Sequence, residues 1–140
     1  MKNKQILFTD IHKAELAETD VRELDSGSVL VKTEYTVISG GTERACLMGL
    51  PNTPQKFPMS LGYCGVGYVE AVGEDVKKVS IGDRVLVYHG VHAKYNVVPE
   101  SDVTLVENEK ISSLEASFVI IASMGHGGVR KLELELGESA

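Results

Sequence analysis

Side chains that could do chemistry gather in one short segment of the sequence, Ser39-Gly40-Gly41-Thr42-Glu43-Arg44. Its glycines interrupt a strand-like run, and the residues after them are polar, as in many loops that carry function. The Thr42 hydroxyl could relay a proton or could satisfy a turn. Glu43 and Arg44 could pair with each other on a solvated loop, which would need no catalysis.

A second candidate is Tyr63, which stands beside glycines at the start of another strand-like run. A phenol at a cleft can donate to a substrate carbonyl as a general acid, but a tyrosine here can also simply pack its ring. Cys46 and Cys64 could respond to oxidants, and the alternative is that each is a small buried hydrophobe. The histidines lack the spacing of a metal-ligand set, so we interpret them as surface residues: His12, His89, His92 and His126.

The elements that must position these residues are strands. Residues 28–39 give the longest alternating pattern, in which Val29, Val31 and Tyr35 share one face. Residues 61–90 alternate twice between a strand and a turn, with Gly62, Gly65 and Gly67 lined up along one short ribbon. Because these glycines have no Cβ, another backbone or a ligand can come close to them.

Further short strands are predicted at residues 5–9, 14–21, 84–88, 92–99 and 103–106, separated by turns and by a proline-rich loop over 51–58. This spacing predicts a mainly β protein, a small and partly open β-barrel. Ser112 and Glu115 have the spacing of a capping box, which predicts a helix start there. The apolar run after it continues the helix until the glycines at 125–128 weaken or divide it.

Composition excludes several functions. The 140 residues suit one domain, and a net charge of −6 with scattered lysines and arginines argues against nucleic acid. No run approaches the roughly 20 apolar residues of a membrane helix, and no secretory leader opens the chain. We therefore expect a cytoplasmic protein.

The stretch from Leu61 to Gly90 resembles the glycine-rich signature of the medium-chain dehydrogenase/reductase superfamily, and the chain is identified as a GroES-like N-terminal domain of that superfamily. Zinc-dependent members read Gly-His-Glu where this chain reads Gly62-Tyr63-Cys64. Their other two zinc ligands fall on Gly40, or on Ser39 with a one-residue offset, and near Ile120 or Ile121. Because these residues replace thiolate, imidazole and acid ligands, the resemblance points to a branch that lacks zinc.

The resemblance implies a GroES-like barrel over residues 1–111 and a helical connection over 112–140 toward a nucleotide-binding domain absent from this sequence. It implies a zinc-independent NAD(P)-dependent oxidoreductase that transfers hydride to or from a small alcohol, carbonyl or activated alkene. Its candidate site consists of catalytic Ser39, Thr42, Glu43 and Tyr63 and cofactor-binding Gly40 and Gly41. The fragment alone would be inactive, and the full-length form would be a homodimer or homotetramer.

Two alternatives come from another class of function. Lys78 to Val87 also resembles the Gly-Asp-Lys/Arg-Val-Leu strand of the GroES co-chaperonins, which would make the chain an assembly module. The chain could also be a stand-alone binding module that keeps the cleft without a nucleotide domain. The helical tail after the barrel favours the dehydrogenase over the co-chaperonin.

Overall fold

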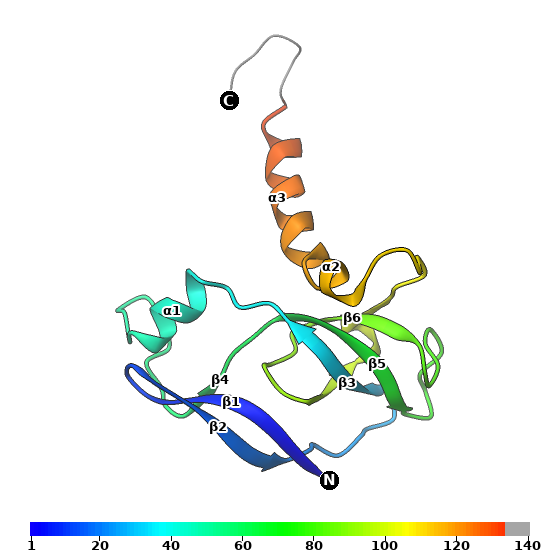
Figure 1. Cartoon of the computed structure of the whole chain (residues 1–140), viewed down its shortest axis with the longest axis horizontal. Helices are drawn as coiled ribbons and strands as arrows, with labels where there is room; N and C mark the ends of the chain where they lie inside the picture. Colours follow the sequence, from blue (N-terminus) through cyan, green and yellow to red (C-terminus); the bar gives the residue numbers. More distant parts are fainter. Residues whose placement is uncertain (134–140) are drawn as a thin grey trace.

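The computed structural model describes residues 1–133, and strands dominate it (Figure 1). Its elements are β1 (Lys2–Asp10), β2 (Lys13–Asp20), β3 (Ser28–Thr36), α1 (Thr42–Leu47), β4 (Met59–Ser60), β5 (Cys64–Val72), β6 (Arg84–Tyr88), β7 (Tyr95–Pro99), the 3-10 turn η1 (Glu100–Asp102), β8 (Val103–Leu105), α2 (Ser113–Ser117) and α3 (Val119–Lys131). Helices follow the strands as far as Lys131, and residues 134–140, which belong to the predicted helical connection over 112–140, lie outside the described residues.

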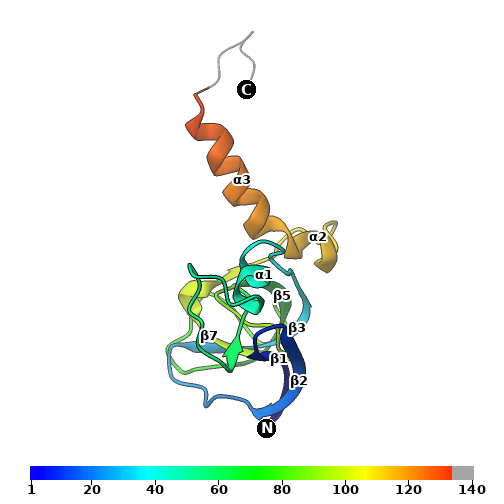
Figure 2. The same ribbon diagram turned by 90° about the vertical axis from the view of Figure 1, so that its left-hand side faces the viewer.

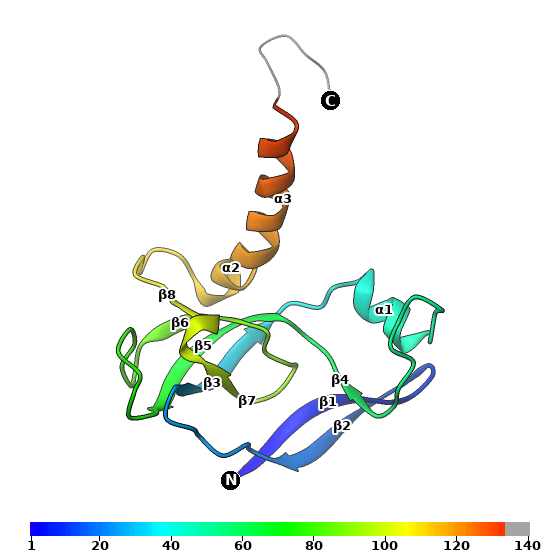
Figure 3. The same cartoon turned by 180° about the vertical axis from the view of Figure 1, so that it is seen from behind.

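Two antiparallel sheets build the body. One has the order β2-β1-β4, and the larger one has the order β7-β3-β5-β6-β8. The larger sheet curls into a half-barrel, which confirms the predicted GroES-like, partly open barrel with a C-terminal helix. Figure 3, which shows the chain from behind, labels β7 and β8, two strands that Figure 1 does not label.

The core of the half-barrel consists of valines. β-branched side chains suit the pleated surface of a sheet, and two-residue alternation directs them to one face. The buried cluster is Val29, Val31, Val69, Val79, Val85, Val87, Val98 and Val103. Removing each from water contributes roughly 1.5 kcal/mol or more to stability.

The predicted glycine ribbon is confirmed as a place of close backbone approach. A Cβ on Gly67 would overlap the carbonyl oxygen of Lys32 on β3, and one on Gly65 would lie 2.9 Å from the carbonyl oxygen of Tyr35. Gly62 has φ +118°, and a Cβ there would lie 2.9 Å from the His92 amide nitrogen. Glycine at these positions lets β5 pack against its neighbours.

Two local predictions are wrong. The register of β3 against β5 shifts between Thr33 and Tyr35, so Tyr35 leaves the buried face and is 45% exposed. Such an irregularity turns the following side chains over, because the side-chain period of a strand is two. Strand β7 begins at Tyr95, so residues 92–94 form the loop before it.

The C-terminal helices also differ from the prediction in one detail. Ser112 and Glu115 form the predicted capping box, with Oγ of Ser112 accepting from the Glu115 amide at 3.2 Å. The division falls at Phe118, between α2 and α3, and not at the glycines. Buried Ala116 and Ser117 hold α2 on the sheet, whereas the glycines lie in open space on a helix that projects away from the barrel (Figures 1 and 2).

Candidate functional site

The candidate site lies at the end of the barrel where β3 and β6 finish and β5 begins. Thr36 is paired with Gly65, and Cys64 with Tyr88, so antiparallel pairing brings these strand ends to one edge. The loop of residues 37–41 leaves β3 at this edge and leads into α1. Figure 1 shows α1 beyond the end of β3.

Glu43 is the centre of the site. It lies in the first turn of α1, yet it is only 4% exposed, so its carboxylate needs partners. One oxygen, Oε1, accepts the Ser39 amide at 2.7 Å, and the other, Oε2, lies 2.7 Å from Nε2 of His92. The prediction that Glu43 could pair with Arg44 on a solvated loop is therefore wrong.

His92 is the buried member of the candidate site that the sequence did not reveal. It was expected to be a surface histidine, as His12, His89 and His126 are, but it is buried. Its Nδ1 lies 2.8 Å from Oγ1 of Thr36, so both ring nitrogens are engaged. Its partners lie 49 and 56 residues away along the chain, and no local pattern marks contacts of that range.

The loop between these anchors carries most of the predicted site residues. Ser39 is half-buried, and its carbonyl accepts the Glu43 amide at 2.9 Å. Gly40, Gly41 and Thr42 are exposed, and a Cβ added at either glycine would meet nothing within 4 Å. The structure therefore joins Ser39 to Glu43 and leaves the backbone of Gly40 and Gly41 open to approach.

Tyr63 and Cys64 lie next to the start of that loop. The Val37 amide donates to the Cys64 carbonyl at 3.2 Å, and the His89 amide donates to the Tyr63 carbonyl at 2.8 Å. Tyr63 itself is half-buried. Burial raises the pKa of the Cys64 thiol, the Glu43 charge raises it further, and a side-chain hydrogen bond with Tyr63 acts in the opposite direction. Cys46 and Cys64 are both free and buried, as the simpler prediction had it.

The residues at the three expected zinc-ligand positions do not fit that metal. Gly40 and Ile120 offer no donor side chain, and Ile120 lines a different pocket beside Tyr88 and Met124. Glu43 and His92 are already bonded to each other. Within residues 1–133, no group of three or more His, Cys, Asp and Glu side chains could hold a metal ion.

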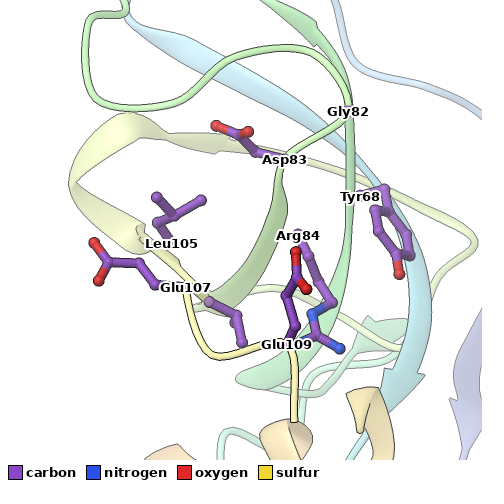
Figure 4. Close-up of a pocket in the computed structure, with 8 residues that line it drawn as sticks. Tyr68, Gly82, Asp83, Arg84, Leu105, Glu107 and Glu109 are labelled. Atoms are coloured by element: carbon purple, nitrogen blue, oxygen red, sulfur yellow. The ribbon is translucent and has the colours of Figure 1, made fainter. Parts of the chain in front are cut away.

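Another pocket, of about 350 Å³, lies on β5, β6 and β8 and includes none of the predicted site residues (Figure 4). Its carboxylates are those of Asp83, Glu107 and Glu109, and its one guanidinium, Arg84, donates to the Asn108 carbonyl at 3.0 Å. An acidic lining of this kind disfavours the anionic phosphates of a dinucleotide. The residues that the structure describes include no helix long and apolar enough to cross a membrane.

The fold agrees with what comparison with known proteins shows. Residues 25–128 match the alcohol dehydrogenase GroES-like domain, and the chain belongs to that family, within the medium-chain dehydrogenase/reductase superfamily. It is similar to the uncharacterized zinc-type alcohol dehydrogenase-like protein YdjJ of Escherichia coli, with 31% identity over 114 residues.

Solved structures agree on the fold. ECK1772 of Escherichia coli, described as an oxidoreductase/dehydrogenase of unknown specificity involved in membrane biogenesis, gives a TM-score of 0.83 at 21% identity over 99% of this chain. The Escherichia coli quinone oxidoreductase complexed with NADPH gives 0.68 at 20% identity over 81% of this chain. The chain spans 33% of the length of YdjJ and 49% and 36% of those two structures, so it corresponds to the GroES-like part of its relatives.

Proposed function

We propose that the chain is the substrate-side domain of an NAD(P)-dependent oxidoreductase that works without zinc. Membership of the superfamily supports hydride transfer, and the relative solved with NADPH supports a nicotinamide cofactor. The observation that carries the proposal is the arrangement of the candidate site, where a buried Glu43–His92 pair underlies an exposed loop with open glycine backbone.

In this proposal the loop binds the reacting end of the substrate. The amides of residues 40–42 and the hydroxyls of Ser39 and Thr42 polarise a carbonyl oxygen, because hydrogen-bond donors fixed in place stabilise charge that develops there. Thr42 or Tyr63 supplies the proton that this oxygen takes up during reduction. A nicotinamide, when bound, supplies or accepts the hydride, and the proposed role of Gly40 and Gly41 is to let it come close.

The proposal excludes zinc because of the donor set. A catalytic zinc needs three protein ligands at about 2.0–2.3 Å and an open position. Tyr63 is the one ligating side chain at the three matched positions, and a phenol there serves as a hydrogen-bond donor. The name of one relative, the zinc-type alcohol dehydrogenase-like protein YdjJ, mentions zinc, so a measurement of metal content tests this part of the proposal directly.

The proposal also includes the division of the chain and its setting. Residues 1–111 make the barrel, and residues 112–140 lead toward the nucleotide-binding part of a longer form. That form is a cytoplasmic homodimer or homotetramer, and the free, buried Cys46 and Cys64 suit a reducing compartment. The 140 residues alone carry no dehydrogenase activity in this proposal.

The test is a fluorescence titration with NADH and NADPH of this chain and of any longer product of its reading frame, with zinc measured in both. We expect binding by the longer product alone, carbonyl or quinone reduction that resists chelators, and no stoichiometric zinc. Failure of both forms to bind either nucleotide would overturn the enzyme assignment. One tightly held zinc per chain would overturn the zinc-free mechanism.

A further inference from the structure

His92 joins the two ends of the loop that carries the candidate site. Its Nδ1 lies 2.8 Å from Oγ1 of Thr36, the last residue before the loop, and its Nε2 lies 2.7 Å from Oε2 of Glu43, just after it. The second carboxylate oxygen of Glu43 accepts the Ser39 amide inside the loop. One imidazole thus links the start, the middle and the end of the segment 37–42.

The polarity of these hydrogen bonds follows from the chemistry of the partners. A carboxylate can only accept, so Nε2 of His92 carries the proton that it donates to Glu43. In the neutral imidazole, Nδ1 then accepts from the Thr36 hydroxyl. Every polar atom of the His92 ring and both carboxylate oxygens of Glu43 are therefore satisfied, as buried polar groups must be.

Val37 fixes the start of the loop, because its side chain is buried and its amide donates to the Cys64 carbonyl. Beyond it, Ile38 is 66% exposed, and Gly40 and Gly41 have open space where side chains would be. Glycine adopts more backbone conformations than other residues, so a loop with two of them needs restraints from outside. The buried side chains that restrain residues 38–42 are Glu43 and, through it, His92.

We infer that His92 is a positioning residue, which sets the conformation of residues 37–42 by holding Thr36 and Glu43 at a fixed separation. It acts through these partners and does not itself touch the substrate. The inference rests on the proposed function for the chemical role of the loop. The restraint itself is a property of this chain and is tested without activity.

The experiment is amide NMR on the ¹⁵N-labelled chain, with His92→Ala, His92→Gln and two controls. His126→Ala removes an exposed histidine on α3, and Val29→Ala weakens the valine core at the far end of β3. We expect His92→Ala to shift or broaden the amide signals of Ser39, Gly40 and Gly41 more than any others outside the immediate neighbours of residue 92. His92→Gln, which keeps a donor and an acceptor, should restore them in large part.

The controls separate positioning from general loss of stability. Val29→Ala should lower the melting temperature and leave the loop signals in place, and His126→Ala should change neither. Loop signals that stay unchanged in folded His92→Ala, or that move equally in Val29→Ala, would overturn the inference. If His92→Ala does not fold, Thr36→Val removes only the bond to Nδ1, and the same shift of the loop signals is expected from it.

The two proposals fail in different ways. If the loop signals depend on His92 but the longer form binds no nicotinamide nucleotide, the positioning role of His92 stands and the oxidoreductase proposal is wrong. If His92→Ala leaves both carbonyl reduction by the longer form and the loop signals unchanged, the oxidoreductase proposal stands and the positioning role of His92 is wrong.

Discussion

The valine wall of the half-barrel and the end that carries the candidate site are built from different side chains. The wall buries the eight valines of the core cluster, whose side chains have no hydrogen-bonding group. At the polar end, where β3 and β6 finish, Thr36, Glu43 and His92 are buried or half-buried, and their polar groups are bonded to one another or to the backbone. Apolar packing stabilises the first region, and hydrogen bonds stabilise the second.

This difference shows how one fold combines an apolar wall with a specific polar site. Apolar packing tolerates related side chains as long as volume is kept, so the valine core defines the fold without defining a function. A buried polar network tolerates little, because each group that loses its partner bears the full cost of desolvation. The polar end is therefore where substitutions should affect both stability and the candidate site.

The largest effect is expected in the wall, from Gly67→Ala. The new Cβ would overlap the Lys32 carbonyl, so β3 and β5 could not keep their pairing. We expect a loss of about 4 kcal/mol or more, measured as the free energy of unfolding in urea. Gly27→Ala is the matched control, because nothing lies within 4 Å of its added Cβ. Equal stability of the two variants would contradict the packing described for the ribbon.

A somewhat smaller effect is expected from Glu43→Ala at the polar end. This change leaves Nε2 of buried His92 and the Ser39 amide without their acceptor, and each buried group left unsatisfied costs about 1–3 kcal/mol. The chain offers a matched exposed pair, His89 and Asp102, which lie 3.2 Å apart with side chains 59% and 23% exposed. Asp102→Ala should cost about 1 kcal/mol or less in the same urea experiment. Similar losses for both variants would mean that burial does not distinguish the two pairs.

Gly40→Ala separates stability from function. Its added Cβ meets nothing within 4 Å, and no positive φ is found there. The substitution should therefore leave stability within about 1 kcal/mol of the wild type, with any change toward greater stability. Under the proposed function, the methyl group narrows the approach to the loop and lowers carbonyl reduction by the longer form. A variant that is less stable, or stable and fully active, would count against the role given to this glycine.

The smallest effect concerns stability at acidic pH, and it involves Glu100, which lies outside both the valine wall and the polar end. Hydrogen bonds from the backbone amides of Lys78 and Lys77 lower the pKa of Glu100, a half-buried residue. Because the folded pKa lies below the unfolded one, its contribution is complete above its ordinary pKa of about 4.3 and is lost as the pH falls through the folded value. Melting temperature against pH should therefore fall less steeply in acid for Glu100→Gln. An unchanged slope would show that these bonds do not couple to folding.

Much of the wall could be predicted from the sequence. Alternation over residues 28–32 places Val29 and Val31 in the core, and the glycines of the ribbon mark close approach. The capping box at Ser112 is likewise a local signal with a local cause. Tyr35 is the exception in the wall. The irregularity before it arises in the pairing of β3 with β5, and the residues of β3 alone do not indicate it.

The site could be predicted only in part. The loop of residues 39–43 stands out by its composition, and the resemblance to the superfamily placed an acid at Glu43. The partner of Glu43 could not be found in this way. His92 follows a turn without a distinctive residue pattern, and it lies next to Glu43 only in the folded barrel. Long-range pairing of buried polar groups depends on the fold, and the local sequence around either partner does not indicate it.

The central claim is that small molecules bind at the polar end, on the loop of residues 38–42 and Tyr63. The most direct measurement is a titration of the ¹⁵N-labelled chain with a small ketone such as cyclohexanone at high millimolar concentration, followed by amide NMR. The account predicts the largest shifts at Ser39, Gly40, Gly41, Thr42 and Tyr63. Largest shifts at Tyr68, Arg84 and Glu109 in the pocket of Figure 4, or a loop unaffected by the ketone, would contradict it.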